Sequence, residues 1–332
     1  MGGDLQGKTI FVTGGSGGLG KSIARLLASR GANVTIFARR ESPLNEARED
    51  IFASRINEEQ EIKAIALDLS EFQKVREAFV AQPRIPDALY CAAGGNHAEN
   101  GFLVDIDANQ LDRCMKNNYY ATVYPTKALV DTWTEDDKKN QKHTGKPKLR
   151  QIIIVSSAAA FLGLPGSIAY TPAKAAVRAL ADTLRMEFLR HSSATSTYTV
   201  HCAFPGDFVS PGFYLEQNTK TSLTKRMQGT HKPLEVLEAN CPSSDKVASR
   251  IVAAVDRGEF IICGDSWAIS LLFTNMIGPS LKRGIGVLDS LLGLLAGWLL
   301  YPILRRRWDA MTKEDGREWR KSWSKLDNGR GT

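Results

Sequence analysis

The stretch Thr9–Gly20, TIFVTGGSGGLG, decides the fold of this chain. A strand-forming run, Thr9–Thr13, leads directly into a glycine-rich turn and then into a helix-forming stretch. Glycines permit a tight turn and let a pyrophosphate approach the backbone N–H groups at a helix N-terminus. The order strand, turn and helix therefore predicts a dinucleotide site. The residues expected to contact the dinucleotide here are Gly14, Ser16, Gly17, Gly18, Leu19 and Gly20.

The same turn also fits a second pattern. Gly14-x-Ser16-x-Gly18 matches the G-x-S-x-G turn that carries the nucleophile of many hydrolases. That turn usually lies late in a chain, with an acid and a histidine after it. We therefore favour dinucleotide binding.

Outward from this turn, strand-like and helix-like stretches alternate. Most of the strand candidates are continuous apolar runs, as is typical of strands buried on both faces. Repeated strand–helix units of this kind predict a doubly wound parallel sheet of the α/β class. The strand candidates are Thr9–Thr13, Asn33–Ala38, Ile62–Leu67, Ala88–Cys91, Gln151–Ser156, Tyr198–Ala203 and Phe260–Cys263, and the helical stretches include Gly20–Arg30, Leu44–Ile56, Phe72–Ala81 and Ala169–Leu189.

The end of the second strand indicates which dinucleotide is bound. An acidic residue there would bond the ribose 2′-hydroxyl of NAD, but the sequence reads Ile36-Phe37-Ala38-Arg39-Arg40. Guanidinium groups pair well with a 2′-phosphate. The sequence therefore favours NADPH/NADP+, with Arg39 the better candidate because it is nearer the strand. The alternative is that one or both arginines are simply solvated.

Tyr170, Lys174 and Ser157 form a candidate catalytic set. Tyr170 and Lys174 are four residues apart in a helix-like stretch, which places both on one helix face. A phenol with a pKa near ~10 transfers protons poorly at neutral pH unless that pKa is shifted. A neighbouring ammonium, helped by an oxidised nicotinamide, stabilises the phenolate. Ser157 follows the fifth strand, and its hydroxyl can bond a carbonyl oxygen.

Together these motifs resemble the short-chain dehydrogenase/reductase family over roughly residues 7–265. The resemblance implies a single Rossmann-like domain with Asn118, Ser157, Tyr170 and Lys174 as catalytic residues. It also implies that Asn118 supports a water relay and that Lys174 lowers the pKa of Tyr170. Where the family has an NNAG turn, this sequence has Cys91-Ala92-Ala93-Gly94. The cofactor-binding role of that turn is therefore left to its backbone and shape. The further cofactor contacts implied are Asp68, Leu69, Gly94, Pro205, Ser210, Tyr170 and Lys174.

A narrower resemblance concerns one branch of this family. The segments Asn118–Pro125 and Pro205–Phe213, with an apolar C-terminal extension, are similar to reductases that act on a long-chain sphingoid ketone. The branch implies NADPH-dependent reduction in sphingolipid biosynthesis, on the cytosolic side of the endoplasmic reticulum membrane. The alternatives are reduction of another lipid, steroid or retinoid carbonyl, and a non-catalytic NADP-binding scaffold. Family members are commonly oligomers, so we expect a homo-oligomer.

Two segments after the sixth strand complete the expected organisation. Residues 207–240 lie where the family places its substrate lid. Residues 266–308 are apolar, include the helix-length run Gly284–Leu304, and are expected to associate with a membrane. A re-entrant or in-plane helix, a spanning helix, and a helix packed on the domain or on a partner all fit the sequence. Residues 309–332 form a polar basic tail.

Charge and cysteine content exclude other classes of protein. The 332 residues carry a net charge of +7, and Lys282–Thr332 holds eleven Lys and Arg against six Asp and Glu. Basic residues beside an apolar run suit a membrane surface better than nucleic acid. The five cysteines show no C-x-x-C spacing, so we expect no metal site. The Lys-rich stretch Thr134–Arg150 lacks periodicity and is predicted to be a solvated loop.

Overall fold

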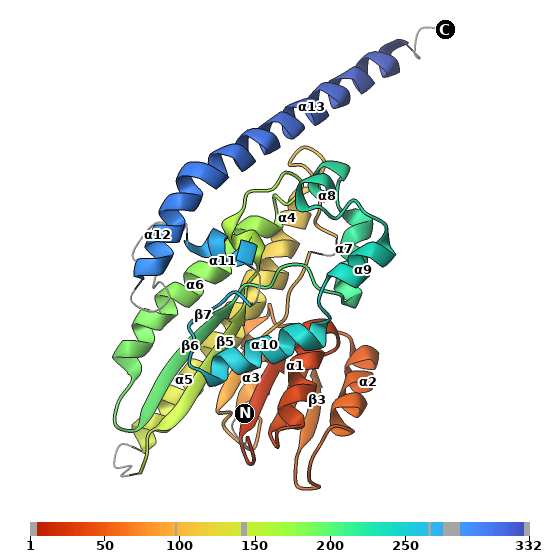
Figure 1. The fold of residues 1–332 in the computed structure, drawn as a ribbon. Coiled ribbons are helices and arrows are strands. Elements are labelled where there is room, and N and C mark those ends of the chain that lie inside the picture. Colours follow the sequence, from red (N-terminus) through yellow and green to blue (C-terminus); the bar gives the residue numbers. More distant parts are fainter. Residues whose placement is uncertain (1–4, 97, 141–144, 265–266, 275–285, 329–332) are drawn as a thin grey trace.

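The computed structural model describes residues 5–96, 98–140, 145–264, 267–274 and 286–328. Seven parallel strands form one sheet in the order β3-β2-β1-β4-β5-β6-β7 (Figure 1). All seven predicted strands are present, with ends that differ by a few residues. The Rossmann-like doubly wound sheet is therefore confirmed. The strands are β1 Thr9–Thr13, β2 Asn33–Ala38, β3 Ile62–Ala66, β4 Ala88–Cys91, β5 Lys148–Val155, β6 Ser196–Ala203 and β7 Ile261–Ile262.

Helices cover both faces of this sheet (Figure 1). A single-turn π-helix, Lys116–Tyr120, joins α4 to α5 without a break, and a second, Ala296–Leu300, joins α12 to α13. The α-helices are α1 Gly18–Ala28, α2 Glu41–Phe52, α3 Phe72–Val80, α4 Ala108–Met115, α5 Ala121–Lys139, α6 Tyr170–His191, α7 Pro211–Thr219, α8 Ser222–Gln228, α9 Leu234–Asn240, α10 Ser244–Asp256, α11 Trp267–Thr274, α12 Val287–Leu295 and α13 Tyr301–Asn328; a 3-10 turn covers Ala158–Phe161.

Strand β1 lies at the centre of the sheet, where the strand order reverses. Thr13, its last residue, pairs with Phe37 of β2 and with Cys91 of β4. In sheets of this kind, ligands bind beyond the carboxyl ends of the strands at the point of reversal. The glycine-rich turn therefore opens at the position where a dinucleotide is expected.

The core has two apolar layers, one on each face of the sheet. Along β1, Ile10 and Val12 pack into the layer with α1 and α10, whereas Phe11 points into the layer with α3, α5 and α6. Phe11, Phe37 and Phe79 pack together in edge-to-face and tilted arrangements, with ring centroids 5.0–5.1 Å apart. Burial on both faces explains why the strands read as continuous apolar runs.

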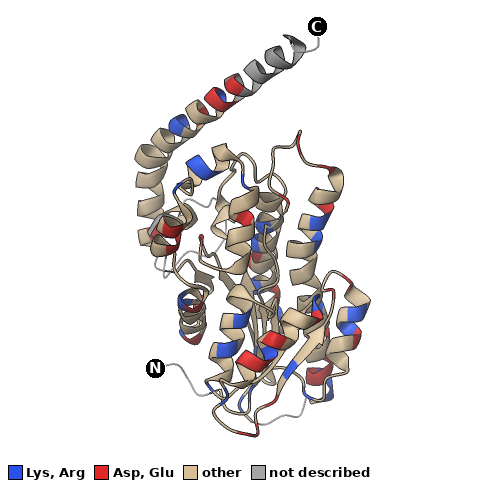
Figure 2. Cartoon of the chain, turned by 90° about the vertical axis from the view of Figure 1, so that its right-hand side faces the viewer, with Lys and Arg blue, Asp and Glu red and all other residues tan. Residues whose placement is uncertain are grey.

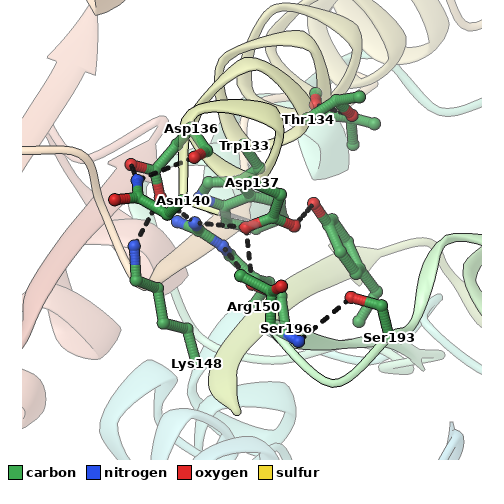
Figure 3. Close-up of polar contacts among 12 residues, drawn as sticks. Trp133, Thr134, Asp136, Asp137, Asn140, Lys148, Arg150, Ser193 and Ser196 are labelled. Atoms are coloured by element: carbon green, nitrogen blue, oxygen red, sulfur yellow. Dashed lines mark hydrogen bonds and ion pairs between the residues drawn. The ribbon is translucent and has the colours of Figure 1, made fainter. Parts of the chain in front are cut away.

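The prediction of a solvated loop over Thr134–Arg150 was wrong for most of its length. Helix α5 continues to Lys139 and β5 begins at Lys148, while residues 141–144 lie outside the described part of the chain. Arg150, only 4% exposed, contacts both Asp136 and Asp137 (Figure 3). Asp136, Asp137 and Arg150 therefore form a largely buried ion-pair network, which has no hydrophobic periodicity to reveal it, while Glu135, Lys138 and Lys139 remain exposed.

Asp137 joins that network to strand β6. It accepts hydrogen bonds from Ser196 Oγ at 2.7 Å and Tyr198 Oη at 2.5 Å, and pairs with Arg150 Nη2 at 3.0 Å. Burial opposes ionisation of Asp137, but these three partners outweigh it and lower the pKa of the carboxyl. The network fixes the end of α5 against β5 and β6, remote from the carboxyl ends of the strands (Figure 3).

The apolar C-terminal segment forms a long helix from α12 through α13 (Figure 1). The stretch Val287–Asp315 of this helix is long and apolar enough to cross a membrane. Most of the residues that the structure describes in this helix are uncharged (Figure 2). Helix α12 packs on α11, and α13 contacts α8 of the expected lid. No break separates the expected apolar segment from the basic tail, since α13 continues through residue 308. The flanking Lys282 and Arg283 lie outside the described residues.

Candidate active site

The glycine-rich turn is fixed by contacts between the ends of three strands. Thr13 Oγ1 accepts hydrogen bonds from the N–H groups of Ala92 and Ala93 at 3.1 and 3.2 Å, and Gly14 N donates to Phe37 O at 2.8 Å. Gly14 has φ +70°, and a Cβ there would lie 2.8 Å from Ala92 O. The backbone can follow this path only at glycine, so the turn is built tightly against β4.

The open side of the turn suits a pyrophosphate. A Cβ on Gly17 would meet nothing within 4 Å, and α1 begins at the next residue. Gly17, Gly18 and Leu19 line the cavity described below, so the N-terminus of α1 is accessible to an anion. Ser210 closes the far side, because a Cβ on Gly18 would lie 3.4 Å from Ser210 Cβ. These residues fit a dinucleotide, as the sequence predicted.

Arg39, Arg40 and Asp68 surround the adenosine end of the expected site. Arg39 and Arg40 are exposed where β2 ends, and Arg39 Nη1 donates to Asn117 Oδ1 at 2.9 Å. Asp68 accepts hydrogen bonds from Ser70 N at 2.9 Å and Ser70 Oγ at 2.8 Å. Burial opposes ionisation of Asp68, but Ser70 and the charge of Arg39 lower its pKa overall. A carboxylate acceptor and two guanidinium groups therefore line this end.

Asn118 is held inside the π-helix between α4 and α5. Its side chain exchanges hydrogen bonds with Gly95 N and Gly95 O, both at 3.0 Å, and donates to Cys114 O at 3.0 Å. Asn118 is completely buried and lies behind the Gly94–Gly95 turn. Single π-turns are frequent at functional sites. The Asn118 amide thus holds the backbone of the turn that follows β4 in place.

Gly94 separates Asn118 from Lys174. A Cβ on Gly94 would lie 2.7 Å from Asn118 Oδ1 and 3.2 Å from Lys174 Nζ, and the residue has φ +142°. Lys174 is buried and donates from Nζ to Val155 O at 3.1 Å. Glycine is therefore required for these two side chains to approach each other.

Lys174 also lies close to Tyr170 on α6. Its Nζ is 5.7 Å from the centre of the Tyr170 ring, and burial lowers the pKa of Lys174 to about 8. Burial and then the charge of Glu216 raise the pKa of Tyr170, while a hydrogen bond with Ser157 opposes that rise. The expected lowering of the Tyr170 pKa is thus not what the structure shows. Tyr170 keeps its proton at neutral pH, as a proton donor must.

Ser157 begins the 3-10 turn after β5. Its Oγ accepts a hydrogen bond from Ala159 N at 3.1 Å, which leaves the hydroxyl proton free to reach another acceptor. The adjacent Ser156 Oγ donates to Lys174 O at 3.0 Å and so ties β5 to α6. Ser157, Tyr170 and Lys174 are therefore held by neighbouring elements around one point.

One cavity of about 1410 Å³ joins these groups. It is lined by every predicted site residue except Asn118, which lies behind its wall. Residues that sequence reasoning did not single out also line it, from the expected lid and from the C-terminal helix. The predicted lining residues are Gly14, Ser16, Gly17, Gly18, Leu19, Gly20, Arg39, Asp68, Leu69, Gly94, Ser157, Tyr170, Lys174, Pro205 and Ser210; the additional ones include Asp207, Glu216, Leu272, Leu304 and Trp308.

Comparison with known proteins places this geometry in context. The family model described as short chain dehydrogenase matches residues 8–214. A short chain dehydrogenase/reductase from Burkholderia phymatum, solved in complex with NAD, superposes with a TM-score of 0.64 at 16% identity, covering 82% of this chain and 94% of that one. At that identity the likeness shows the fold.

Curated relatives cover most of the chain. A PIGF/3-ketodihydrosphingosine reductase fusion protein of Schizosaccharomyces pombe is 33% identical over 92% of this chain, which spans only 56% of the fusion protein. A 3-ketodihydrosphingosine reductase of Aspergillus fumigatus is 30% identical over 91% of this chain and 84% of its own length. That of Bos taurus is 31% identical over 82% of this chain and 76% of its own.

Proposed function

This chain belongs to the short chain dehydrogenase family, and from that premise we propose that it reduces 3-ketodihydrosphingosine to the 3-hydroxy product in sphingolipid synthesis. The curated relatives support this substrate by their names. The observation that carries the proposal is the shared cavity, in which Tyr170 and Ser157 meet an apolar wall containing Leu304 and Trp308. A long hydrocarbon chain can lie on such a wall while its ketone reaches the polar end.

The residues of the turn and of β2 support a nicotinamide nucleotide, and we propose NADPH. When bound, the reduced nicotinamide supplies the hydride. Arg39 and Arg40 offer two guanidinium groups for a 2′-phosphate at the adenosine end. No acidic residue follows β2 directly to take the ribose 2′-hydroxyl in the manner of an NAD site.

Tyr170 is the proposed proton donor. Its phenol is protonated at neutral pH, since burial and the Glu216 charge raise its pKa. As hydride reaches the carbonyl carbon, the oxygen gains negative charge and takes the phenolic proton. Ser157 orients that oxygen through its hydroxyl proton. The Lys174 ammonium stabilises the phenolate that forms, and Asn118 supports proton return from solvent through the Gly94–Gly95 turn.

The C-terminal helix supports a place at the membrane surface, with the catalytic domain in the cytosol at the endoplasmic reticulum. Leu300 and Leu304 face the cavity, whereas Leu294, Trp298 and Ile303 are exposed by 55%, 79% and 68%. One side of the helix thus packs on the domain while the other presents apolar side chains. We propose an in-plane or re-entrant association of residues 266–308, with residues 309–332 extending as a basic tail.

A substrate panel tests the function. Purified full-length protein is supplied with NADPH and, in parallel, 3-ketodihydrosphingosine, a steroid ketone, a retinoid carbonyl and an acyl ketone. We expect NADPH oxidation chiefly with the sphingoid ketone. Faster turnover of another carbonyl would transfer the assignment to that substrate class.

Carbonate extraction of membranes tests how residues 266–308 associate with the membrane, because a spanning helix would stay in the pellet and an in-plane helix would be released.

A further inference from the structure

A cluster of three charged residues lies in the cavity wall beside the proposed catalytic residues. Lys220 Nζ is 3.0 Å from Glu216 Oε1 and 3.7 Å from Asp207 Oδ1. The Lys220 side chain is 1% exposed, whereas those of Glu216 and Asp207 are 23% and 34% exposed. Both carboxylates line the cavity. Two carboxylates therefore share one buried ammonium, and the side facing the cavity carries surplus negative charge.

Helix α7 fixes this cluster in place. Glu216 and Lys220 are four residues apart at the end of α7, which places them on one side of the chain. The helix begins at Pro211 and is capped by Ser210, whose Oγ accepts a hydrogen bond from Phe213 N at 3.1 Å. Ser210 itself contacts the glycine-rich turn. The position of Glu216 is therefore tied through one short helix to the cofactor end of the cavity.

The carboxylates act on the phenol of Tyr170. After burial, the charge of Glu216 is the largest influence that raises the pKa of Tyr170, and Asp207 adds to it. Burial likewise raises the pKa of Glu216, Lys220 lowers it, and Asp207 raises it again. A second cation at this point would stabilise the ionised carboxylate. Buried charges that lack sufficient partners are costly, so the cluster is suited to a positively charged ligand group.

We propose that Glu216, with Asp207 beside it, binds the ammonium group that a sphingoid ketone carries on the carbon next to its carbonyl. This inference rests on the proposed function, because that substrate is a 2-amino-1-hydroxy-3-ketone. Its amino and keto groups are on adjacent carbons, so a group that binds the ammonium has to lie close to the proton donor. Glu216 and Tyr170 line the same cavity, and steroid, retinoid and simple acyl ketones have no ammonium to offer Glu216.

The test compares two substrates in two variants. Glu216→Gln and the control Glu235→Gln, which changes an exposed residue of α9, are assayed with 3-ketodihydrosphingosine and with the matched long-chain ketone lacking the 2-amino group. Loss of a charged hydrogen bond predicts about a 10- to 100-fold lower kcat/KM for the aminoketone in Glu216→Gln, mostly through KM. The ratio of kcat/KM for the aminoketone to kcat/KM for the deaminated ketone should fall by this factor in Glu216→Gln and stay unchanged in Glu235→Gln, because the influence of Glu216 on the pKa of Tyr170 acts on both ketones alike.

Other outcomes decide between the two proposals. Equal losses for both ketones, or no loss for the aminoketone, would overturn the role of Glu216 and leave the proposed function standing. Failure of the unaltered protein to reduce the aminoketone would overturn the proposed function itself. Folding of Glu216→Gln is checked by circular dichroism and NADPH binding. If it does not fold, the comparison of the two ketones in the unaltered protein tests the proposal. The unaltered protein must prefer the aminoketone over the deaminated ketone by the same factor, and equal use of both contradicts the proposal.

Discussion

Replacing Gly94 with alanine should disrupt the close approach of Asn118 and Lys174 in the candidate site. The new Cβ would lie 2.7 Å from Asn118 Oδ1 and 3.2 Å from Lys174 Nζ. Neither atom is free to move, because Asn118 bonds Gly95 and Cys114 while Lys174 bonds Val155. The backbone at φ +142° is also a conformation that alanine rarely adopts.

These effects determine how much stability and activity Gly94→Ala should lose. A non-glycine residue held in such a conformation costs about 1–3 kcal/mol. Displacing the Asn118 amide weakens its two bonds to Gly95, each worth about 0.5–1.5 kcal/mol. We therefore expect Gly94→Ala to lower the free energy of unfolding by about 2–6 kcal/mol. A shift of Lys174 by about 1 Å should also lower kcat by roughly 100-fold.

Urea unfolding and steady-state kinetics measure the two losses. Gly163→Ala is the matched control, because a Cβ there meets nothing within 4 Å and the residue lies on an exposed turn. The control should unfold and turn over like the unaltered protein. If Gly94→Ala behaved like Gly163→Ala in both assays, the tight contact between Gly94, Asn118 and Lys174 would be refuted.

Three further substitutions test other parts of the account. Tyr170→Phe should lower kcat by about 10²–10⁴-fold, the usual contribution of general acid catalysis, with NADPH affinity unchanged by fluorescence titration; near-normal turnover would remove Tyr170 from the mechanism. Arg39→Ala should raise the KM for NADPH by about 10- to 100-fold through the lost charged hydrogen bond, and the KM for NADH should stay constant; a parallel rise for both would count against a 2′-phosphate site. Asp137→Asn should lower the free energy of unfolding by about 1–3 kcal/mol near neutral pH, because a charged acceptor is lost from Arg150 and Tyr198. The pKa of Asp137 is lowered in the folded state, so its stabilisation is present above the unfolded value near 3.8 and is lost as pH falls through the folded pKa. The difference between variant and unaltered protein should therefore shrink in acid, and a difference independent of pH would contradict this.

The fold could be predicted from the sequence because local and long-range signals agree. The continuous apolar strands reflect burial on both faces, and the glycine-rich turn Gly14–Gly20 requires a strand before it and a helix after it. Tyr170 and Lys174 could be paired because helical spacing brings them together within one element. Asn118 was found only through resemblance, since nothing near it in the sequence marks the π-helix that buries it.

Contacts between distant segments could not be predicted in this way. Arg150 and Asp137 look like ordinary surface charges until α5 and β5 are packed together. Glu216 and Lys220 have helical spacing, but the place of Glu216 in the same cavity as Tyr170 depends on how residues 207–240 pack against the rest of the chain. The same holds for Leu304 and Trp308, which line the cavity from a helix for which the sequence left membrane association and packing on the domain both open. The structure thus shows that part of the C-terminal segment lines the same cavity as Tyr170.

The most direct measurement follows NADPH and product together. Full-length protein is mixed with 3-ketodihydrosphingosine and NADPH, the loss of nicotinamide absorbance is recorded, and the sphingoid product is quantified by mass spectrometry. We predict one mole of 3-hydroxy product for each mole of NADPH oxidised, and about 10²–10⁴-fold slower product formation with Tyr170→Phe. Absence of the hydroxy product in the unaltered protein, or its undiminished formation by Tyr170→Phe, would contradict the account.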